Sequence, residues 1–396
     1  MRQERDDRRL VHGSKLANLG YGIEARSIEI DADAGRIGGH RIRGPAENHF
    51  RSYLLGCCGN LGRKEKVVNK GCNLHPYIID RMVTEYYEAA RNNAAVWEKD
   101  RFGILKLTGS ERASWLQGMV TNDVQKLAPD TGCYAAHLTA QGKMVAQMLI
   151  LADEDTLWLT LERAAIPGLV GAFDKLLIME DVQIADLSDQ ISILSVLGPN
   201  ARAVIESWLQ QPVGIRRPYE HRSFEQVRVV FGELGYEVWV PKEQSDTALR
   251  ALAKTGAMAI DHGTWDILRT EAGIPAYGID IDDTTTLPEL GEKGISYEKG
   301  CYIGQEVVAK VKYIGHVNRK FVGLVMEADE IPNPKSAIQK SGKDVGYVTT
   351  AVFSPALNKP IALGFVGRAA ATPGMDVDVV SGGHKALAKV VELPFR

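Results

Sequence analysis

The sequence lacks several features that would assign it to large classes of proteins. Its 396 residues contain five cysteines, a sparse and odd number that argues against a disulfide framework and fits a reducing compartment. No stretch approaches the roughly 18 apolar residues that a membrane-spanning helix requires. The first ten residues carry charges of both signs instead of an apolar signal core. We therefore expect a cytoplasmic protein with no membrane segment.

Phosphate-binding loops and a large excess of charge are also missing. There is no Walker-A motif, no Gly-x-Gly-x-x-Gly motif and no internal repeat. The formal net charge of -3 argues against a general nucleic-acid binder but permits a local basic patch. What is present, 45% hydrophobic and 24% charged residues, is typical of soluble globular proteins. The length exceeds that of one ordinary core and predicts two or three domains.

The first 75 residues differ from the rest of the chain. They hold 14 Lys and Arg against 9 Asp and Glu and show no sustained apolar period. We expect a poorly ordered extension, or upstream sequence that does not belong to the folded protein. Cys57, Cys58, Cys72 and His75 could supply four zinc ligands, but adjacent cysteines chelate poorly and no second Cys-x-x-Cys half is present. No metal site is predicted.

Helical and strand patterns alternate between residues 76 and 316. Apolar residues at three- and four-residue spacing predict a helix over 78–90, and Ser110 is the expected N-cap of the next helix. Antiparallel hairpins interspersed with helices indicate an α+β region with mixed or antiparallel sheets. The clearest strands, separated by hairpin signals, are 133–139, 144–151 and 156–161, and a helix is predicted to follow over 164–179.

From residue 317 to 396 the pattern changes to short strands separated by Gly- and Pro-rich connectors. Such spacing predicts a small all-β barrel or sandwich, and we place the domain boundary near residue 317.

A conspicuous block, Lys299 to Glu306, holds a single cysteine between two glycines. A cysteine flanked by lysines is a candidate low-pKa thiolate, and glycines let backbone approach a ligand closely. The competing interpretation is a small residue buried in a tight turn. The residues alone leave both open for Cys301.

Several short segments resemble, in the same order, the folate-binding aminomethyltransferase-like proteins of the glycine cleavage T-protein superfamily. The resemblance covers about residues 80 to 396. It implies a folate-binding region followed by a small barrel, with tetrahydrofolate or a derivative as the ligand. The segments that carry it are 107–112, 117–124, 232–241, 268–278 and 346–350.

Within that superfamily, the block from Lys299 to Glu306 resembles the hallmark of the YgfZ group. Where the T-protein pattern has two adjacent aspartates, one taken as catalytic, this chain has Ala146 and Gln147. An alanine cannot stabilise positive charge or move a proton, and a glutamine cannot ionise. We therefore expect a YgfZ-like accessory protein in iron–sulfur protein maintenance and tRNA modification. Its partners would be iron–sulfur client proteins or tRNA, with Cys301 as the functional thiol.

Three alternatives stay open. The first is a T-protein aminomethyltransferase that moves a methylene unit from a lipoyl-bound aminomethyl group to tetrahydrofolate, with a lipoyl carrier protein as partner. The others are a folate-dependent methyl transferase or demethylase and a scaffold that has lost folate.

The resemblance also implies binding residues. Glu237 is the carboxylate expected to pair with the guanidine-like edge of a pterin, although a strand residue of this kind could equally face solvent. Trp265 stands where the T-protein has an arginine and could stack on a ring. Between residues 293 and 320, six Lys and Arg against two Glu suit an anionic folate tail or RNA phosphate. The remaining cofactor-binding candidates are Glu271, Tyr277, Lys299 and Gln305.

Overall fold

The computed structural model describes residues 30–31, 36–37, 40–41 and 84–395. The chain divides into two compact units, Met1–Asp80 and Arg81–Arg396. In the first unit, three two-residue strands pair antiparallel: β1 (Ile30–Asp31), β2 (Arg36–Ile37) and β3 (His40–Arg41). The four candidate zinc ligands near residues 57–75 lie outside the described residues.

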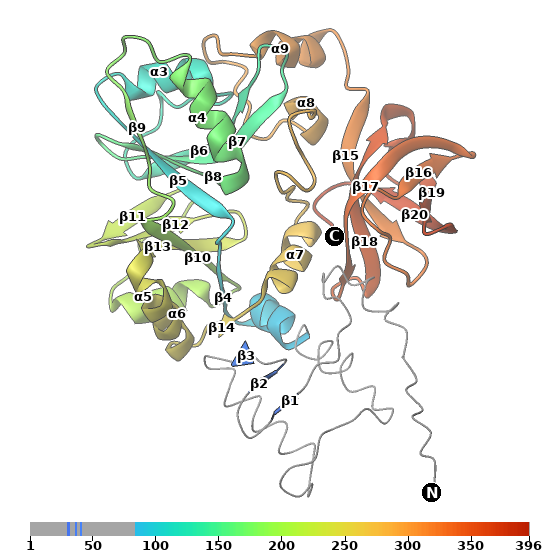
Figure 1. The fold of residues 1–396 in the computed structure, drawn as a ribbon, viewed down its shortest axis with the longest axis horizontal. Helices are drawn as coiled ribbons and strands as arrows, with labels where there is room; N and C mark the ends of the chain where they lie inside the picture. Colours follow the sequence, from blue (N-terminus) through green and yellow to red (C-terminus); the bar gives the residue numbers. More distant parts are fainter. Residues whose placement is uncertain (1–29, 32–35, 38–39, 42–83, 396) are drawn as a thin grey trace, which may run out of the picture. The chain divides into compact units, whose positions relative to one another are not determined.

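The first sheet of the second unit has five strands in the order β6-β7-β8-β5-β9, all paired antiparallel (Figure 1). Every second residue of β7 from Ala146 to Ala152 belongs to one apolar cluster, which is the side-chain alternation of a strand with two different faces. The strands are β5 (Phe102–Thr108), β6 (Thr131–Leu138), β7 (Met144–Ala152), β8 (Leu157–Glu162) and β9 (Gln183–Asp186).

The second sheet has six strands in the order β11-β12-β13-β10-β4-β14. The pair β4 and β14 is parallel and the other pairs are antiparallel, so the sheet is mixed. Its strands are β4 (Ala95–Glu98), β10 (Ile191–Leu197), β11 (His221–Phe224), β12 (Val227–Phe231), β13 (Gly235–Pro241) and β14 (Met258–Ala259).

The two sheets pack face to face, and a pair of helices covers the outer face of each. Helices α3 (Arg112–Met119) and α4 (Ile166–Asp174) bury apolar residues against the first sheet. Helices α5 (Ala201–Leu209) and α6 (Ser245–Lys254) do the same on the second sheet. The inner faces share a separate cluster made of Ile104, Leu151, Ile193, Val230 and Trp239.

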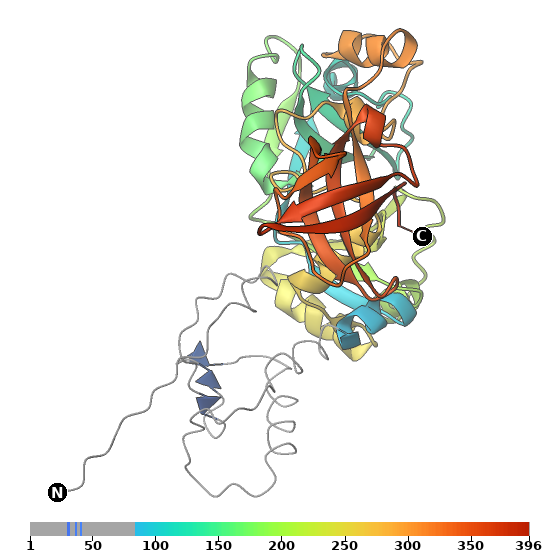
Figure 2. The same ribbon diagram turned by 90° about the vertical axis from the view of Figure 1, so that its right-hand side faces the viewer.

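The C-terminal part is a closed six-stranded barrel, which faces the viewer in Figure 2. The sequence prediction of an α+β fold with a C-terminal barrel is confirmed. The barrel strands, in the order β15-β18-β17-β16-β19-β20, are β15 (Arg319–Met326), β16 (Ala337–Lys340), β17 (Lys343–Ser354), β18 (Lys359–Gly367), β19 (Asp376–Ser381) and β20 (His384–Val391).

Helix α7 (His262–Glu271) joins the barrel to the sheets through a buried polar network. Arg269 donates to Asp280 Oδ2 at 2.8 Å, and both side chains are nearly inaccessible. Thr349 and Thr350, on β17, donate to the other oxygen of Asp280. Because these four residues come from α7, the following loop and the barrel, the network fixes α7 against the barrel wall.

Two local predictions need correction. Ser110 does not cap α3: its hydroxyl donates to Asp181 at 2.8 Å, and Glu111 occupies the N-cap position without a side-chain hydrogen bond. The helix predicted to run to residue 179 ends at Asp174. Within the described parts of the chain, no helix is long and apolar enough to cross a membrane.

Candidate functional site

Strand alternation aims a set of polar side chains into the space between the two sheets. On β8, Leu159 and Leu161 pack under α3 and α4, so Thr160 and Glu162 point the other way. On β13, Val238 and Val240 pack under α5 and α6, so Glu237 joins Trp239 on the inner face. The result is a cavity whose wall includes Glu162 and Glu237.

Glu237 is a buried acid of this cavity that pairs with a buried cation. The ammonium of Lys99, just after β4, lies 2.6 Å from its Oε1, and both side chains are almost fully buried. The other oxygen has a longer contact, 3.5 Å, with the indole N–H of Trp239. Lys99 also sits 3.8 Å from the ring centre of Phe102. The carboxylate of Glu237 is therefore buried and charge-compensated, and one of its oxygens is still available to a further donor.

Aromatic rings form the rest of the wall. Trp265 on α7 lines the cavity and stacks on Trp97, with ring centres 4.5 Å apart and an angle of 17°. Tyr134 and Tyr219 line it as well, and burial raises the pKa of both phenols. Such a wall suits a flat heterocycle that is held by stacking and by a few hydrogen bonds.

Glu162, at the end of β8, is the second buried acid of the cavity. Its carboxylate lies 3.7 Å from Arg101, and burial raises its pKa despite the nearby charges of Arg101, Arg269 and Lys99. The neighbouring strand contributes Gln147, whose amide donates to the carbonyl of Pro275 at 3.2 Å. The cavity thus contains two buried acids in different surroundings, together with the exposed Glu233, which pairs with Lys293.

Two other predicted site residues lie elsewhere. Glu271 lines a second cavity with Arg91, Ser354 and Phe395, and its carboxylate accepts hydrogen bonds from Tyr87 and Ser354. Tyr277 packs between two apolar clusters, and burial raises its pKa. Neither residue lines the cavity that holds Glu237.

The block around Cys301 also lies outside that cavity, and its contacts are those of an anchor. Lys299 is buried, and its ammonium donates to three backbone carbonyls, those of Gln117, Val120 and Asn122. Gly304 adopts φ +83°, and a Cβ there would come within 2.7 Å of the carbonyl of Thr139.

The thiol of this block projects away from the anchor. Cys301 is exposed and unpaired, and Gln305 begins helix α9 (Gln305–Tyr313). The glycine and the lysine of the block therefore dock its loop onto the end of α3, while Cys301 remains accessible.

Three of the six cations of the expected basic patch have acidic partners. Lys293 pairs with Glu233, Lys312 with Glu292, and Arg319 with Glu289. These acids come from outside the patch or from its edge, so the local excess of positive charge is largely compensated.

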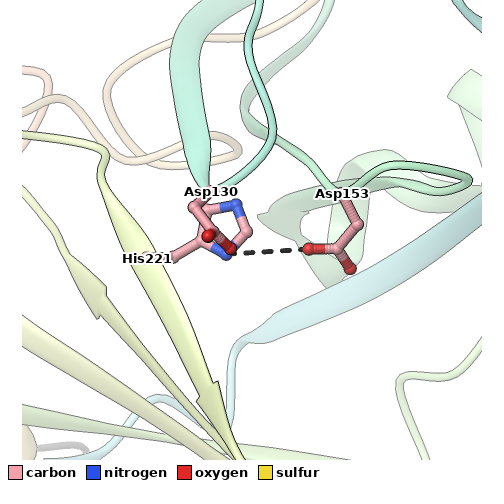
Figure 3. A group of neighbouring side chains, drawn as sticks. All are labelled: Asp130, Asp153 and His221. Carbon is pink, nitrogen blue, oxygen red and sulfur yellow. Dashed lines mark ion pairs between the residues drawn. The ribbon is translucent and has the colours of Figure 1, made fainter.

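A cluster of Asp130, Asp153 and His221 has the composition of a metal site (Figure 3). However, Arg228 already holds Asp153 through two contacts, of 2.6 and 3.1 Å, and lies 3.1 Å from Nδ1 of His221. The remaining ring nitrogen of His221 lies 3.2 Å from the carbonyl of Ala152. An arginine thus takes the place that a cation would need.

Sequence reasoning missed Lys99, Glu162, Tyr134 and Tyr219. The only signal for Glu162 is a charged residue at the end of an otherwise apolar strand, and this pattern is common where strands reach the surface. The ion pair of Lys99 with Glu237 joins residues 138 positions apart, which no local pattern reveals.

The chain is similar to known proteins over both of its main parts. Residues 75–295 match the family described as GCVT N-terminal domain, and residues 319–396 match the glycine cleavage T-protein C-terminal barrel domain. A protein of Bacillus subtilis named aminomethyltransferase is 30% identical, over 79% of this chain and 90% of its own. One of Nostoc with the same name is 29% identical, over 79% and 87%.

Among solved structures, aminomethyltransferase T of the Bartonella henselae glycine cleavage system superposes with a TM-score of 0.74 at 19% identity, covering 79% of this chain and 89% of that one. These findings overturn the expectation of a YgfZ-type accessory role. These relatives are named aminomethyltransferase and match along nearly their whole length, which favours aminomethyl transfer over a role in iron–sulfur maintenance or tRNA modification.

Proposed function

Because the chain belongs to the glycine cleavage T-protein family, we propose that it is an aminomethyltransferase that uses tetrahydrofolate as the one-carbon acceptor. The observation that carries the proposal is the buried carboxylate of Glu237 in an aromatic-lined cavity between the two sheets. The donor would be an aminomethyl group on a lipoyl carrier protein. A cytoplasmic location stays a prediction.

The cavity fits a pterin. A carboxylate has about four lone-pair positions, so Glu237 can keep its contact with Lys99 and still accept the ring N–H and the exocyclic amine of a pterin. The ammonium of Lys99 offsets the charge of this carboxylate in a buried position, where an uncompensated charge would be costly. Trp265 and the two tyrosines offer faces for stacking.

The chain's own residues therefore divide the work of binding. Glu237 orients the ring, Lys99 orients Glu237, and the inner faces of the sheets exclude water. Tetrahydrofolate supplies the nitrogens that accept the one-carbon unit. Because Glu271 and Lys299 are committed to buried hydrogen bonds, we assign them to holding the fold.

The test is twofold and uses the full chain. Tetrahydrofolate binding is measured by calorimetry for wild type and Glu237→Gln, which keeps the shape and removes the charge. Losing a hydrogen bond to a charged group costs about 2 kcal/mol of binding free energy, which predicts a roughly 30-fold weaker affinity for tetrahydrofolate. Glu243→Gln, the same change at an exposed position, is the matched control and should bind like wild type.

Transfer is measured as ammonia release from an aminomethylated lipoyl carrier protein in the presence of tetrahydrofolate. We expect turnover by wild type and the control. Absence of turnover by wild type would refute the transfer function, and absence of folate binding would refute the assignment of the cavity.

A further inference from the structure

Glu162 faces the site from the strand beside Gln147. The register pairs Leu149 with Thr160 across β7 and β8, and two more residues along each strand bring Gln147 opposite Glu162. Both line the cavity that holds Glu237. The pair places an ionisable carboxyl next to an amide that cannot ionise.

The two cavity acids are compensated very differently. Glu237 has an ammonium at 2.6 Å, whereas the nearest cation to Glu162, Arg101, lies at 3.7 Å and is one-third exposed. The backbone N–H of Tyr277 also faces Glu162. A weakly compensated carboxyl that is only 7% exposed favours its neutral form, and burial accordingly raises the pKa of Glu162.

Two buried carboxyl groups with different partners can divide binding and proton transfer within one site. We propose that Glu162 is the proton-carrying catalytic residue of this cavity, while Glu237 is the binding residue that stays paired with Lys99. The inference rests on the proposed aminomethyl transfer and names the group that would move its proton.

The proton balance of that reaction requires such a group. The methylene carbon exchanges its bonds to the amine nitrogen and to sulfur for bonds to two folate nitrogens, and nothing is oxidised or reduced. Two N–H protons are released, and the departing amine and the sulfur each take up one. Glu162 gives its carboxyl proton to the amine that leaves as ammonia and regains a proton from a released N–H.

Other charged groups face Glu162 and shape its titration. They are Arg101 at the strand end, Lys99 after β4 and Arg269 on α7, with the phenol of Tyr134 across the cavity. The three cations oppose protonation, so the neutral form depends on exclusion of water from the cavity. Ligand binding that excludes more water strengthens this preference.

The first test does not depend on turnover. The protein is labelled with carbon-13 at its glutamate side-chain carboxyls and titrated by NMR, and the signal of Glu162 is assigned by its loss in Glu162→Gln. We expect a midpoint above that of the exposed Glu154, assigned in the same way through Glu154→Gln. A midpoint at or below that of Glu154 would overturn the proposal.

The second test separates this residue's role from the proposed function as a whole. Glu162→Gln should bind tetrahydrofolate within about threefold of wild type but lose at least about 100-fold in kcat, and Glu162→Asp should recover part of it. Glu154→Gln should match wild type in both. Wild-type kcat in Glu162→Gln refutes the role of Glu162 alone, whereas an inactive wild type refutes the transfer function. If Glu162→Gln does not fold, the titration of the wild-type signal, assigned through Glu162→Asp, decides.

Discussion

Replacing Asp280 with alanine should measure how strongly the barrel is held to α7. The carboxylate is fully buried and accepts from Arg269, from two barrel threonines and from the backbone N–H of Ala276. Removing one partner of a buried ion pair typically costs 3–5 kcal/mol, because the other charge is left uncompensated. Arg269 keeps a second carboxylate, that of Asp266 at 2.6 Å, so we expect the lower end, about 3 kcal/mol.

The assay is urea unfolding followed by tryptophan fluorescence and by circular dichroism, whose transitions must coincide before a free energy of unfolding is derived. The control is Asp283→Ala, an exposed aspartate three residues away, which should change the free energy by less than about 0.5 kcal/mol.

A double variant, Asp280→Ala with Arg269→Met, removes both charges together. It should be destabilised by less than the sum of the two single variants. A cost below about 1 kcal/mol for Asp280→Ala, or strict additivity in the double variant, would refute the assignment of this pair as the main link.

Three further results are expected. Burial and Arg228 lower the pKa of His221 below 6.5 in the folded protein, so the unfolded state binds an extra proton as the pH falls through 6.5. The free energy of unfolding should then decrease as the pH falls, and His221→Gln should show a smaller decrease. Equal slopes of the unfolding free energy against pH in the two proteins would contradict this. Iodoacetamide should modify the exposed Cys301 well before Cys133, because burial raises the pKa of the Cys133 thiol to about 12. Peptide mass spectrometry, with Cys301→Ser as the control, measures the order of modification, and the reverse order would contradict the expectation. Lys299→Met leaves three backbone carbonyls without their donor and should lower the free energy of chemical unfolding by about 3 kcal/mol. An equal loss in Lys310→Met, a change at an exposed position nearby, would argue against the anchoring role of Lys299.

The fold was largely predictable because its strands and hairpins leave local marks. Gly142 has φ +73° in the turn that joins β6 to β7, where the sequence predicts a hairpin. The N-cap of α3 was not predictable. Ser110 has the right chemistry, but Asp181, 71 residues away, competes for its hydroxyl.

The candidate site was predictable only in part, for a related reason. Glu237 could be singled out by resemblance, and alternation on β13 explains why it faces the interior. The surroundings that decide its chemistry are Lys99 and Trp239, which reach it through tertiary packing. Counting charges between residues 293 and 320 could not reveal the partners of Lys293, Lys312 and Arg319, because those acids lie outside that window.

The apolar cluster shared by the inner sheet faces has a consequence for how this protein can be divided. Trp239 of one sheet and Trp158 of the other meet edge to face, and Ile104 and Val230 pack beside them. A gene fragment that encodes only one of these sheets would expose half of this cluster to water and lose its burial free energy. Because β4 belongs to the second sheet but precedes the first one in the chain, a cut after β9 leaves part of the second sheet in each half. The halves should therefore fold together or not at all, and limited proteolysis should find no surviving single-sheet fragment.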